Sequence, residues 1–523
     1  MMDVALLLAV AALAFAVRRV THIPLIPLLL LAGIGLSLSD LALDRDTARH
    51  ALDLGLAVLV FSAGMELNPK RFGAHKHWVL GVGFGQFFLI GLGGVLVTRG
   101  FGYSWQIALY LGLAISTSST LIIVRLLKSR QQMFEPFGRV VTGTLLLQDL
   151  LIILMIVALI RLPDGVWGVV QGLGGLSILL LMCVVGLRYV MPFMVLRMKL
   201  DQEALGLAIL MVLFVFMSVA HLLNLPLITG AFLAGVSLSA FPINSVARGL
   251  ISSITSFFMA LFFIVLGGLI QFPSATEWLL AGALTALILV GTPIIVTLVA
   301  LRMGMNTRSA IESGLLLAMT SEFSLLVGLQ GYLIGQLPSE IFNVVAVVTV
   351  VTMTVTPLLA TDRLTWWLMR IVPGSAPQAA GDLAALSGHV VMLGYGKGSS
   401  VVFKALKQAG YDVVIVNDDA AVVRDLVAQG TSAVYGDGSD PRVLDLVQAR
   451  RAKIIIASMR RVSDAESVLR LLGREHPPLI IRVFDPDEAA RIEACGGIPV
   501  ISSEAAAEAF MKWHEQVIQP HSK

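Results

Sequence analysis

The sequence holds little charge and few cysteines for its length. Only 14% of its 523 residues are Asp, Glu, Lys or Arg, whereas 57% are hydrophobic. The formal net charge of +3 is too small to indicate a nucleic-acid partner. The two cysteines, Cys183 and Cys495, lie in different regions, so neither a disulfide framework nor a metal cluster is predicted. This composition is typical of a chain with many membrane-spanning helices.

The N-terminus lacks the features of a cleaved signal peptide. The first apolar run, Val4 to Val17, has no basic residue before it and ends in Arg18-Arg19, and no small-residue cleavage site follows. We therefore interpret it as a retained helix. About 20 apolar residues are needed for each crossing of a bilayer, and the chain predicts about 13 spans. They fall near residues 3–17, 23–39, 51–66, 78–98, 104–127, 139–161, 166–193, 203–223, 226–242, 250–271, 276–302, 308–335 and 341–370.

Basic residues alternate between the predicted loops. The loops after odd-numbered spans hold most of the Arg and Lys, for example Arg18-Arg19, Lys70-Arg71 and Arg302. Loops after even-numbered spans are richer in acids, for example Glu277 and Glu340. By the positive-inside rule the odd-span loops are cytoplasmic. We expect the N-terminus outside the cell and the C-terminal region in the cytoplasm.

One acid interrupts an apolar run in the sixth predicted span. Asp149 lies in the middle of the apolar stretch 145–154. A charged side chain at the centre of a bilayer costs about 2.5 to 3.5 kcal/mol on insertion scales, and such residues usually mark ion or proton pathways. We predict that Asp149 binds and exchanges a cation and a proton. The alternative is a carboxylate that is satisfied inside the helix bundle.

Two polar clusters interrupt the fifth and twelfth spans. Residues 116–120 read Ser-Thr-Ser-Ser-Thr, and residues 320–324 read Thr-Ser-Glu-Phe-Ser. The clusters are seven spans apart, so their spans run in opposite directions, which is typical of inverted repeats with broken helices around a midplane site. The alternative is that Ser and Thr bond back to their own helices. The predicted ion and proton site comprises Asp149, Gln148, Ser118, Ser119, Thr120 and Glu322.

Other polar residues of the predicted spans receive structural interpretations. For Glu322 we favour an electrostatic role at a helix N-terminus over a place on the ion path. Arg125 and Arg139 lie near cytoplasmic ends, where long basic side chains extend toward water. Glu66 is expected at a helix end with Lys70, and His221 as a satisfied helix residue rather than a proton relay.

The C-terminal region reads as a separate soluble domain. Residues 371–388 contain Pro and Gly with little apolar periodicity, so we place a linker there, between a membrane domain at 1–370 and a domain at 389–523. Alternating strand and helix patterns predict an α/β, Rossmann-like doubly wound parallel sheet. The expected strands are 389–394, 412–417, 432–436, 453–458, 479–483 and 499–502. The whole chain is thus predicted to be a polytopic α-helical membrane protein, with crossed broken helices, followed by this cytoplasmic domain.

A glycine-rich turn follows the first of these strands. Gly394, Gly396 and Ser399 fit G-x-G-x-x-G with Ser in the third glycine position. The first glycine allows a tight turn, the second allows a phosphate to approach, and the N-terminus of the next helix favours an anion. The motif meets its context because it follows a strand and opens a helix. Where an acid usually binds ribose the chain has Asn417, followed by Asp418 and Asp419, so the nucleotide stays open. A Rossmann-like domain that binds nothing is the alternative.

Several motifs in order along the chain resemble the monovalent cation:proton antiporter-2 family. The resemblance is closest to its Kef-type members, which carry a cytoplasmic RCK (KTN) nucleotide-binding domain. The matching motifs are residues 64–71, 118–120, 147–149, 228–235 and 321–323 in the spans, and 394–397 and 435–437 in the soluble domain. The resemblance implies a secondary antiporter that works by alternating access in the bacterial inner membrane. It also implies homodimers formed through both domains.

The resemblance further implies potassium as the exchanged ion. The pair Gln148-Asp149 is associated with the potassium-selective branch, whereas related sodium antiporters often carry Asn-Asp or Asp-Asp. Many relatives have a lysine in the eleventh span, where this chain has Thr292. One titrating carboxylate then gives one-for-one, electroneutral exchange of K⁺ for H⁺. A Na⁺/H⁺ antiporter stays an alternative, disfavoured only by Gln148.

Two other classes fit the sequence less well. A ligand-gated K⁺ efflux channel needs a filter of repeated carbonyls, and no T-V-G-Y-G-like segment is present. An enzyme using the Rossmann unit for hydride transfer would need a substrate domain, and none remains beside that unit. The fold alone indicates no such activity.

The resemblance also implies roles for the turn residues of the soluble domain. Lys397 and the backbone at Gly396 and Gly398 would hold phosphate, and Asn417 or Asp419 would hold ribose. We favour AMP or another adenine nucleotide, with NAD(H) as the alternative. The predicted nucleotide site comprises Gly394, Tyr395, Gly396, Lys397, Gly398, Asn417, Asp418, Asp419, Gly436 and Asp437. Arg482 is a further candidate for contact with an anion, and the glutathione control associated with Kef-type systems is not carried over.

Overall fold

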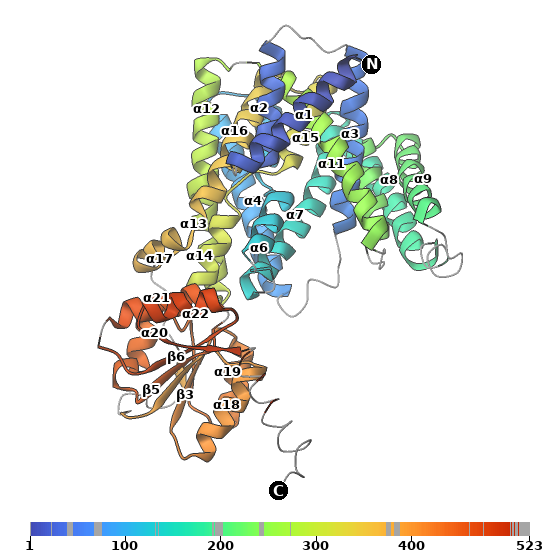
Figure 1. Ribbon diagram of the computed structural model, residues 1–523. Coiled ribbons are helices and arrows are strands. Elements are labelled where there is room, and N and C mark those ends of the chain that lie inside the picture. Colours follow the sequence, from blue (N-terminus) through green and yellow to red (C-terminus); the bar gives the residue numbers. More distant parts are fainter. Residues whose placement is uncertain are drawn as a thin grey trace. The chain divides into compact units, whose positions relative to one another are not determined.

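The chain folds into two compact units, Met1–Pro373 and Gly374–Lys523, and each is described by itself. The computed structural model (Figure 1) describes residues 2–21, 24–38, 45–66, 76–130, 132–133, 135–190, 193, 202–239, 245–271, 273–372, 378–380, 387–459, 461–473, 475–502, 504, 507 and 511.

The first unit is entirely helical within its described residues. Its helices are α1 (Met2–Thr21), α2 (Leu25–Leu38), α3 (Arg45–Glu66), α4 (Lys76–Gly100), α5 (Trp105–Ile115), α6 (Thr120–Ser129), α7 (Pro136–Arg161), α8 (Gly165–Val185), α9 (Gln202–Leu222), α10 (Leu227–Leu238), α11 (Ser245–Gly268), α12 (Ala275–Ala286), α13 (Thr292–Arg302), α14 (Thr307–Leu316), α15 (Glu322–Leu333), α16 (Ser339–Leu359) and α17 (Asp362–Ile371). Short 3₁₀ and π-helical turns continue α7, α8 and α12.

Each predicted span coincides with one helix or with two consecutive helices. Six helical stretches are long and apolar enough to cross a bilayer by themselves, and they are 76–100, 105–129, 137–190, 204–222, 275–302 and 339–359. Four further apolar helices are shorter, at 25–38, 54–65, 227–238 and 253–268. The total of about 13 crossings stays a prediction.

The last predicted span is wrong in its extent. We expected one helix over 341–370, but α16 ends at Leu359 and α17 begins at Asp362. Thr361 causes the restart, because its side chain accepts a hydrogen bond from the backbone N–H of Leu364 and caps α17. Asp362 and Arg363 then give α17 a polar face that an apolar span lacks.

The helices of the first unit form two bundles. In one, α3 packs against α10 and α11, with α2 on α11 and α9 on α10. In the other, α4 packs against α5, α7 and α13, and α15 packs against α5 and α16. Gly64 of α3 and Gly235 of α10 allow a close approach of the two helices in the first bundle. A Cβ atom on either would collide with a carbonyl oxygen of the other helix, that of Phe232 or Phe61.

The second unit is a seven-stranded sheet of order β1-β4-β3-β2-β5-β6-β7. The strands are β1 (Gln378–Ala380), β2 (Val390–Leu393), β3 (Val413–Asn417), β4 (Ala433–Tyr435), β5 (Ile454–Ala457), β6 (Leu479–Val483) and β7 (Ile498–Ile501). The helices between them are α18 (Lys397–Gln408), α19 (Ala420–Ala428), α20 (Pro441–Leu446), α21 (Val462–Leu472) and α22 (Pro486–Ala494).

All six predicted strands are confirmed as β2 to β7, and they are parallel. The prediction missed β1, which lies inside the stretch 371–388 that we expected to be an irregular linker. This strand pairs antiparallel with β4, with Gln378 opposite Tyr435. Three residues, Gln-Ala-Ala, carry too little hydrophobic pattern to be recognised as a strand.

Alternate strand residues separate the two faces of the sheet. Val390, Met392 and Ile415 pack with α18 and α19, whereas Val391 and Leu393 pack with α20, α21 and α22. Both faces are thus covered by helices, as a parallel sheet requires. Helices α21 and α22 and helices α18 and α19 lie on opposite sides of the strands in Figure 1.

Candidate functional site

The first helix break lies between α5 and α6. Helix α5 ends at Ile115, helix α6 begins at Thr120, and the four residues between them are fully buried. The hydroxyl of Ser119 accepts a 3.3 Å hydrogen bond from the N–H of Ile122 and caps α6. A run of Ser and Thr favours such a break because these side chains compete for backbone hydrogen bonds. This break falls where the sequence predicts it.

The second break lies between α14 and α15. Helix α14 ends at Leu316 and α15 begins at Glu322. The break begins at residue 317, three residues before the polar cluster at 320–324. Ser321 caps α15, since its hydroxyl accepts a 3.1 Å hydrogen bond from the N–H of Phe323. Glu322 is 2% exposed and lies in the first turn of α15, where a carboxylate interacts favourably with the helix dipole.

The two breaks cross. The hydroxyl of Ser118 in the first break donates a 2.7 Å hydrogen bond to the carbonyl oxygen of Leu317 in the second. Gln86 of α4 holds the same point, because its Nε2 donates to Ser118 Oγ at 2.8 Å and approaches the Leu317 oxygen at 3.4 Å. The predicted architecture of crossed broken helices is therefore confirmed.

Helix α7 places Asp149 beside the first break. The hydroxyl of Thr120 donates a 2.9 Å hydrogen bond to Asp149 Oδ2, and the N–H of Ser118 donates a 3.1 Å hydrogen bond to Gln148 Oε1. All four residues are buried, with at most 3% of any of them exposed. The structure thus brings Asp149, Gln148, Ser118 and Thr120 together, whereas Ser119 caps α6 and Glu322 opens α15.

Helix α16 supports the second break as α7 supports the first. Thr352 accepts a 3.2 Å hydrogen bond from the N–H of Thr320, and the two hydroxyls are 3.0 Å apart. The hydroxyl of Thr356 donates to the carbonyl oxygen of Ala318. The helix after each break therefore supplies side chains to that break. Among the side chains that α7 and α16 supply to the breaks, only that of Asp149 is a carboxylate.

Sequence reasoning missed Gln86, Thr352 and Thr356. Gln86 is 2% exposed and stands in the apolar stretch of α4. A lone amide in a membrane span was a signal that could have been used. The threonines of α16 gave no such signal, because four threonines occur in that helix.

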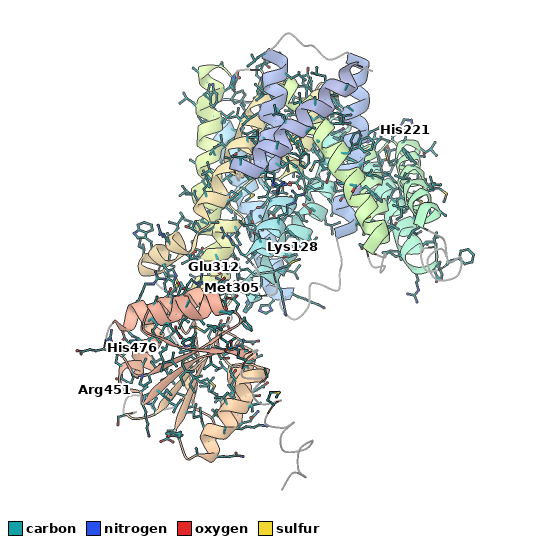
Figure 2. All side chains as sticks on the ribbon, viewed as in Figure 1. Lys128, His221, Met305, Glu312, Arg451 and His476 are labelled. Carbon is teal, nitrogen blue, oxygen red and sulfur yellow. The ribbon has the colours of Figure 1, made fainter. Side chains whose placement is uncertain are left out.

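Of the other residues that we singled out in the predicted spans, some lie away from the crossing and some lie outside the described residues. Arg125, Arg139 and His221 are exposed, and Figure 2 labels His221 on α9. The side chain of Glu66 and the whole of Lys70 lie outside the described residues. Thr292 is buried and begins α13.

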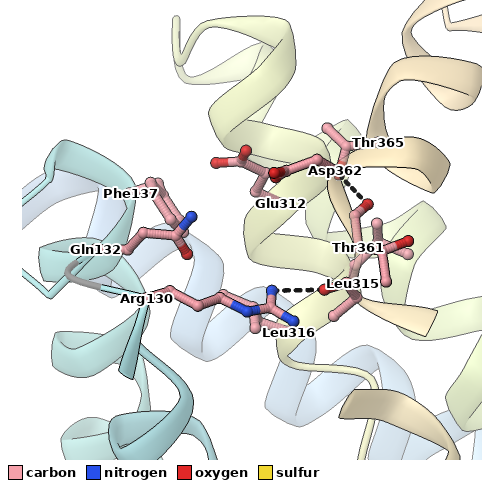
Figure 3. A pocket seen from close by; sticks show the side chains of 10 residues that line it. Arg130, Gln132, Phe137, Glu312, Leu315, Leu316, Thr361, Asp362 and Thr365 are labelled. Carbon is pink, nitrogen blue, oxygen red and sulfur yellow. Dashed lines mark hydrogen bonds between the residues drawn. The ribbon is translucent and has the colours of Figure 1, made fainter. Parts of the chain in front are cut away.

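A pocket lies beside the junction of α16 and α17. Figure 3 shows its lining, which comes from the α6–α7 loop, α7, α14 and the start of α17. Arg130 reaches across it and donates a 2.6 Å hydrogen bond to the carbonyl oxygen of Ala360. Next to it, the buried Arg308 and Glu312 of α14 form an ion pair at 3.0 Å, and Arg308 lies over the ring of Trp366 in α17. Helix α17 is thus attached to α14, one half of the second broken helix.

The glycine turn of the second unit follows β2. Gly394 has φ +89°, and a Cβ there would lie 3.0 Å from the carbonyl oxygen of Ser458, so only glycine fits. The side-chain oxygen of Asn417 accepts a 3.1 Å hydrogen bond from the N–H of Tyr395. Ser399 Oγ accepts a 2.8 Å hydrogen bond from the N–H of Gly396. Both the Ser at the third glycine position and Asn417 therefore shape the turn itself.

Two further turns meet this one at the carboxyl edge of the sheet. Asp437 accepts hydrogen bonds from the N–H and hydroxyl of Ser439 at 2.9 and 2.6 Å. A Cβ at Gly438 would lie 3.1 Å from Leu393, so this turn packs on the end of β2. Asp419 caps α19 by accepting from the N–H of Ala421 at 2.8 Å. This edge includes the point between β2 and β5 where the strand order reverses, and parallel sheets bind ligands there.

One arginine side chain lies beside the glycine turn. Arg482 Nη1 lies 3.4 Å from a Cβ position at Gly398, and its Nε is buried without a hydrogen-bond partner among the described residues. The side chain of Lys397 lies outside the described residues, and Asp418 is exposed. Burial, and to a lesser degree Asp418 and Asp419, raise the pKa of Tyr435 to about 12. The residues present fit an anionic ligand.

Comparison with known proteins gives matches over both units. Residues 5–361 match the family described as "Sodium/hydrogen exchanger, transmembrane", and residues 390–503 match the "TrkA-N domain". The chain is 25% identical over 474 residues to the "Glutathione-regulated potassium-efflux system protein KefC" of Salmonella schwarzengrund (strain CVM19633), covering 87% of this chain and 75% of that protein. It is 25% identical over 519 residues to the "Putative K(+) efflux antiporter KefB" of Alkalimonas amylolytica, covering 94% and 78%.

Comparison with solved structures also gives a match. The sodium proton antiporter MjNhaP1 from Methanocaldococcus jannaschii at pH 8 has 15% identity and a TM-score of 0.48, and the match covers 71% of this chain and 97% of that one. The first family match alone covers more than half of the chain. The chain therefore belongs to the sodium/hydrogen exchanger family, as a Kef-type cation/proton antiporter with a C-terminal TrkA-N domain.

Proposed function

We propose that this protein exchanges K⁺ for H⁺, one for one, at Asp149 in the bacterial inner membrane. The observation that carries the proposal is a buried carboxylate at the crossing of two broken helices, with a hydroxyl donor from one of them. A carboxylate in this position neutralises one cation or holds one proton. Exchange of one for the other moves no net charge.

The elements around Asp149 suit a cation that has lost its water. Helices α5 and α14 end at the crossing, so their last carbonyl groups carry partial negative charge there. Gln148, Ser118 and Thr120 add neutral oxygens, and no Lys occupies the position of Thr292. Opposite half-helix ends and neutral oxygens are the means by which broken-helix transporters hold ions at the midplane. Glu322, in the first turn of α15, would balance the positive end of that half-helix.

Potassium is favoured over sodium by two observations. The relatives over most of this chain are named as potassium-efflux proteins. The pair Gln148-Asp149 places an amide rather than a second carboxylate at the site. Because K⁺ is more weakly hydrated than Na⁺, we expect neutral amide and carbonyl oxygens to favour K⁺. Na⁺/H⁺ exchange is the alternative.

Transport would proceed by movement of one helix bundle against the other around the fixed site. The bundle of α4, α5–α6, α7 and α12–α16 holds the crossing. The bundle of α1–α3 and α8–α11 would form the contact between two copies of the chain. We propose a homodimer with the N-termini outside and the 389–523 domain in the cytoplasm.

Regulation would begin at the glycine turn of the second unit. We propose that AMP, another adenine nucleotide or NAD(H) binds there, with phosphate at Gly396, Gly398 and Arg482. Binding can shift the transporter only if the ligand distinguishes two states of it. The route would run through the segment 371–388 to α17. That helix contacts α14 through Arg308 and Trp366, and α14 ends at the crossing.

The test is exchange by the purified chain in liposomes that carry a pH gradient and a pH-sensitive dye. Addition of K⁺ is expected to move protons equally well with the membrane potential clamped, and Asp149→Asn is expected to abolish this movement. Equal responses to Na⁺ and K⁺ would keep the antiporter and remove the selectivity. Full activity of Asp149→Asn, or K⁺ flux that follows voltage without proton movement, would overturn the proposal.

A further inference from the structure

Helix α4 carries one buried amide at the crossing. Gln86 is 2% exposed and lies in an apolar helix, yet its side chain contacts residues 32 and 231 positions away in the chain. Together with Ser118 and Leu317, Gln86 joins α4 to the first break and to the second. The hydrogen bonds run from Gln86 to Ser118, and from Ser118 to Leu317.

The contacts of Gln86 determine which end of its amide faces the crossing. The carbonyl oxygen of Leu317 can only accept, and the single proton of the Ser118 hydroxyl is donated to that oxygen. Ser118 Oγ can therefore only accept from Gln86, so the NH₂ group must face both atoms. The carbonyl oxygen Oε1 of Gln86 is then directed elsewhere. It is buried and has no hydrogen-bond partner among the described residues.

Other polar atoms without partners belong to the same part of the bundle. Within the described residues they include the hydroxyl oxygens of Thr117, in the first break, and Thr144, one turn before Gln148 on α7. The Nε2 of Gln148 is the fourth. Helices α4, α5 and α7 pack on one another. A buried polar group without a partner costs about 1–3 kcal/mol. Three of the four are oxygens, on α4, in the first break and on α7, which are elements that meet at the crossing, and they indicate a site built for a ligand that these oxygens would hold.

We propose that Gln86 determines the cation specificity of the exchange by placing Oε1 in the coordination shell of a dehydrated monovalent cation at Asp149. Its NH₂ group at the same time positions the two breaks. This inference rests on the proposed function of Asp149. Neutral carbonyl oxygens that replace the water around the ion are the means by which proteins select K⁺ over Na⁺. Gln86 offers one such carbonyl oxygen, and Thr117 and Thr144 offer neutral hydroxyl oxygens, all without adding charge.

The test compares Gln86→Leu with the parent chain for K⁺, Rb⁺ and Na⁺ in liposomes. Loss of Oε1 is expected to raise the half-saturating K⁺ and Rb⁺ concentrations about tenfold, and that of Na⁺ less, so that the ratio of K⁺ to Na⁺ affinity falls. Thr98→Val is the matched control. Thr98 is also a buried polar residue of α4, but its hydroxyl donates within that helix, to the carbonyl oxygen of Gly94. A lower maximal rate for every cation, with unchanged half-saturating concentrations, would reduce Gln86 to a structural residue and overturn the inference.

Two further measurements keep the outcome clear. If Gln86→Leu does not fold, the nearly isosteric Gln86→Met is studied in detergent, where the rise in melting temperature caused by K⁺ is expected to shrink. An unchanged rise would contradict the inference. Asp149→Asn in the liposome assay separates the proposal about Gln86 from the proposed function of Asp149. If it is inactive while Gln86→Leu keeps the parent's cation preference, only the inference about Gln86 fails.

Discussion

Thr120 and Asp149 come from different helices and meet in one hydrogen bond of 2.9 Å, donated by the hydroxyl to the carboxylate. A hydrogen bond to a charged group contributes about 1.5–3 kcal/mol. Thr120→Val removes the donor and keeps the shape. We expect the apparent affinity for K⁺ to fall at least tenfold, which corresponds to about 1.4 kcal/mol. Thr120→Ser keeps the hydroxyl and should exchange like the parent in the liposome assay. Equal affinity of the Val and parent chains would show that this bond does not act on the cation.

The second break predicts a different behaviour for Thr352. Thr352→Val leaves the buried N–H of Thr320 without its acceptor, which should lower the free energy of unfolding by about 1–3 kcal/mol. Cation preference should not change, because no carboxylate stands on α16 near this break. Thermal unfolding of the purified chain measures the first effect. Thr354→Val is the control on the same helix, since the Thr354 hydroxyl donates within α16, to the carbonyl oxygen of Val350. A loss of stability as large for Thr354→Val would contradict the assigned role.

The sequence predicted the parts of the fold that local chemistry decides. The Ser-Thr run at 116–120 breaks a helix because its side chains compete with the backbone. The predicted strands are short, mainly apolar runs, as expected of a parallel sheet that helices cover on both faces. The acid at Asp149 was visible because a charge in an apolar run is rare. Each of these signals lies within about ten residues of chain.

The parts that were missed depend on distant partners. Gln86 acquires its role from Leu317, which is 231 positions away, and no local pattern announces that contact. The second break begins at residue 317, in an apolar segment, because Leu317 and Ala318 give their carbonyl groups to Ser118 and Thr356. Strand β1 exists only through its pairing with β4. The separation of α17 from α16 is marked by Thr361, but it was hidden by the apolar residues on both sides.

The attachment of α17 to α14 can be tested through Arg308. Arg308→Met leaves Glu312 without its ion-pair partner in a buried position, and breaking such a pair costs about 3–5 kcal/mol. The double variant Arg308→Met with Glu312→Leu should recover most of this loss, because no charge then lies buried at the pair. Chemical unfolding of the three chains measures the difference. A double variant as unstable as the single one would show that the ion pair is not the cause.

Trp366 tests the proposed route of regulation without removing a buried charge. Trp366→Leu keeps an apolar side chain on α17 but removes the ring under Arg308. We expect exchange without nucleotide to stay near the parent rate, and the change in rate on adding AMP or NADH to shrink several-fold. Trp367→Leu is the control, because Trp367 is an exposed neighbour on the same helix. An unaltered nucleotide response in Trp366→Leu would exclude this contact from the route.

Tyr435 predicts how the second unit responds to alkali. Its pKa is raised to about 12, chiefly by burial, whereas the ordinary value of 10 applies in the unfolded chain. The folded chain therefore holds one more proton between pH 10 and 12, and the stability that Tyr435 contributes is full below pH 10 and lost as the pH rises through 12. Tyr435→Phe should unfold with a shallower loss of stability in this window. A tyrosinate absorbance difference between the two chains that titrates near pH 10 would contradict the burial of the phenol.

Gly394 provides the sharpest test of the nucleotide turn. Gly394→Ala introduces a side chain at φ +89°, where an L residue is strained by about 1–2 kcal/mol, and it brings Cβ within 3.0 Å of the Ser458 oxygen. The turn must then shift away from β5, and with it the N–H groups that would face a phosphate. We expect AMP or NADH binding, measured by calorimetry on the full chain, to weaken at least tenfold. Gly430→Ala is the matched control, since Gly430 has φ +73° and open space around its Cβ position. It should suffer the backbone strain alone and bind nucleotide like the parent. If both variants bind equally well, the ligand does not contact this turn, and a site elsewhere on the sheet must be sought.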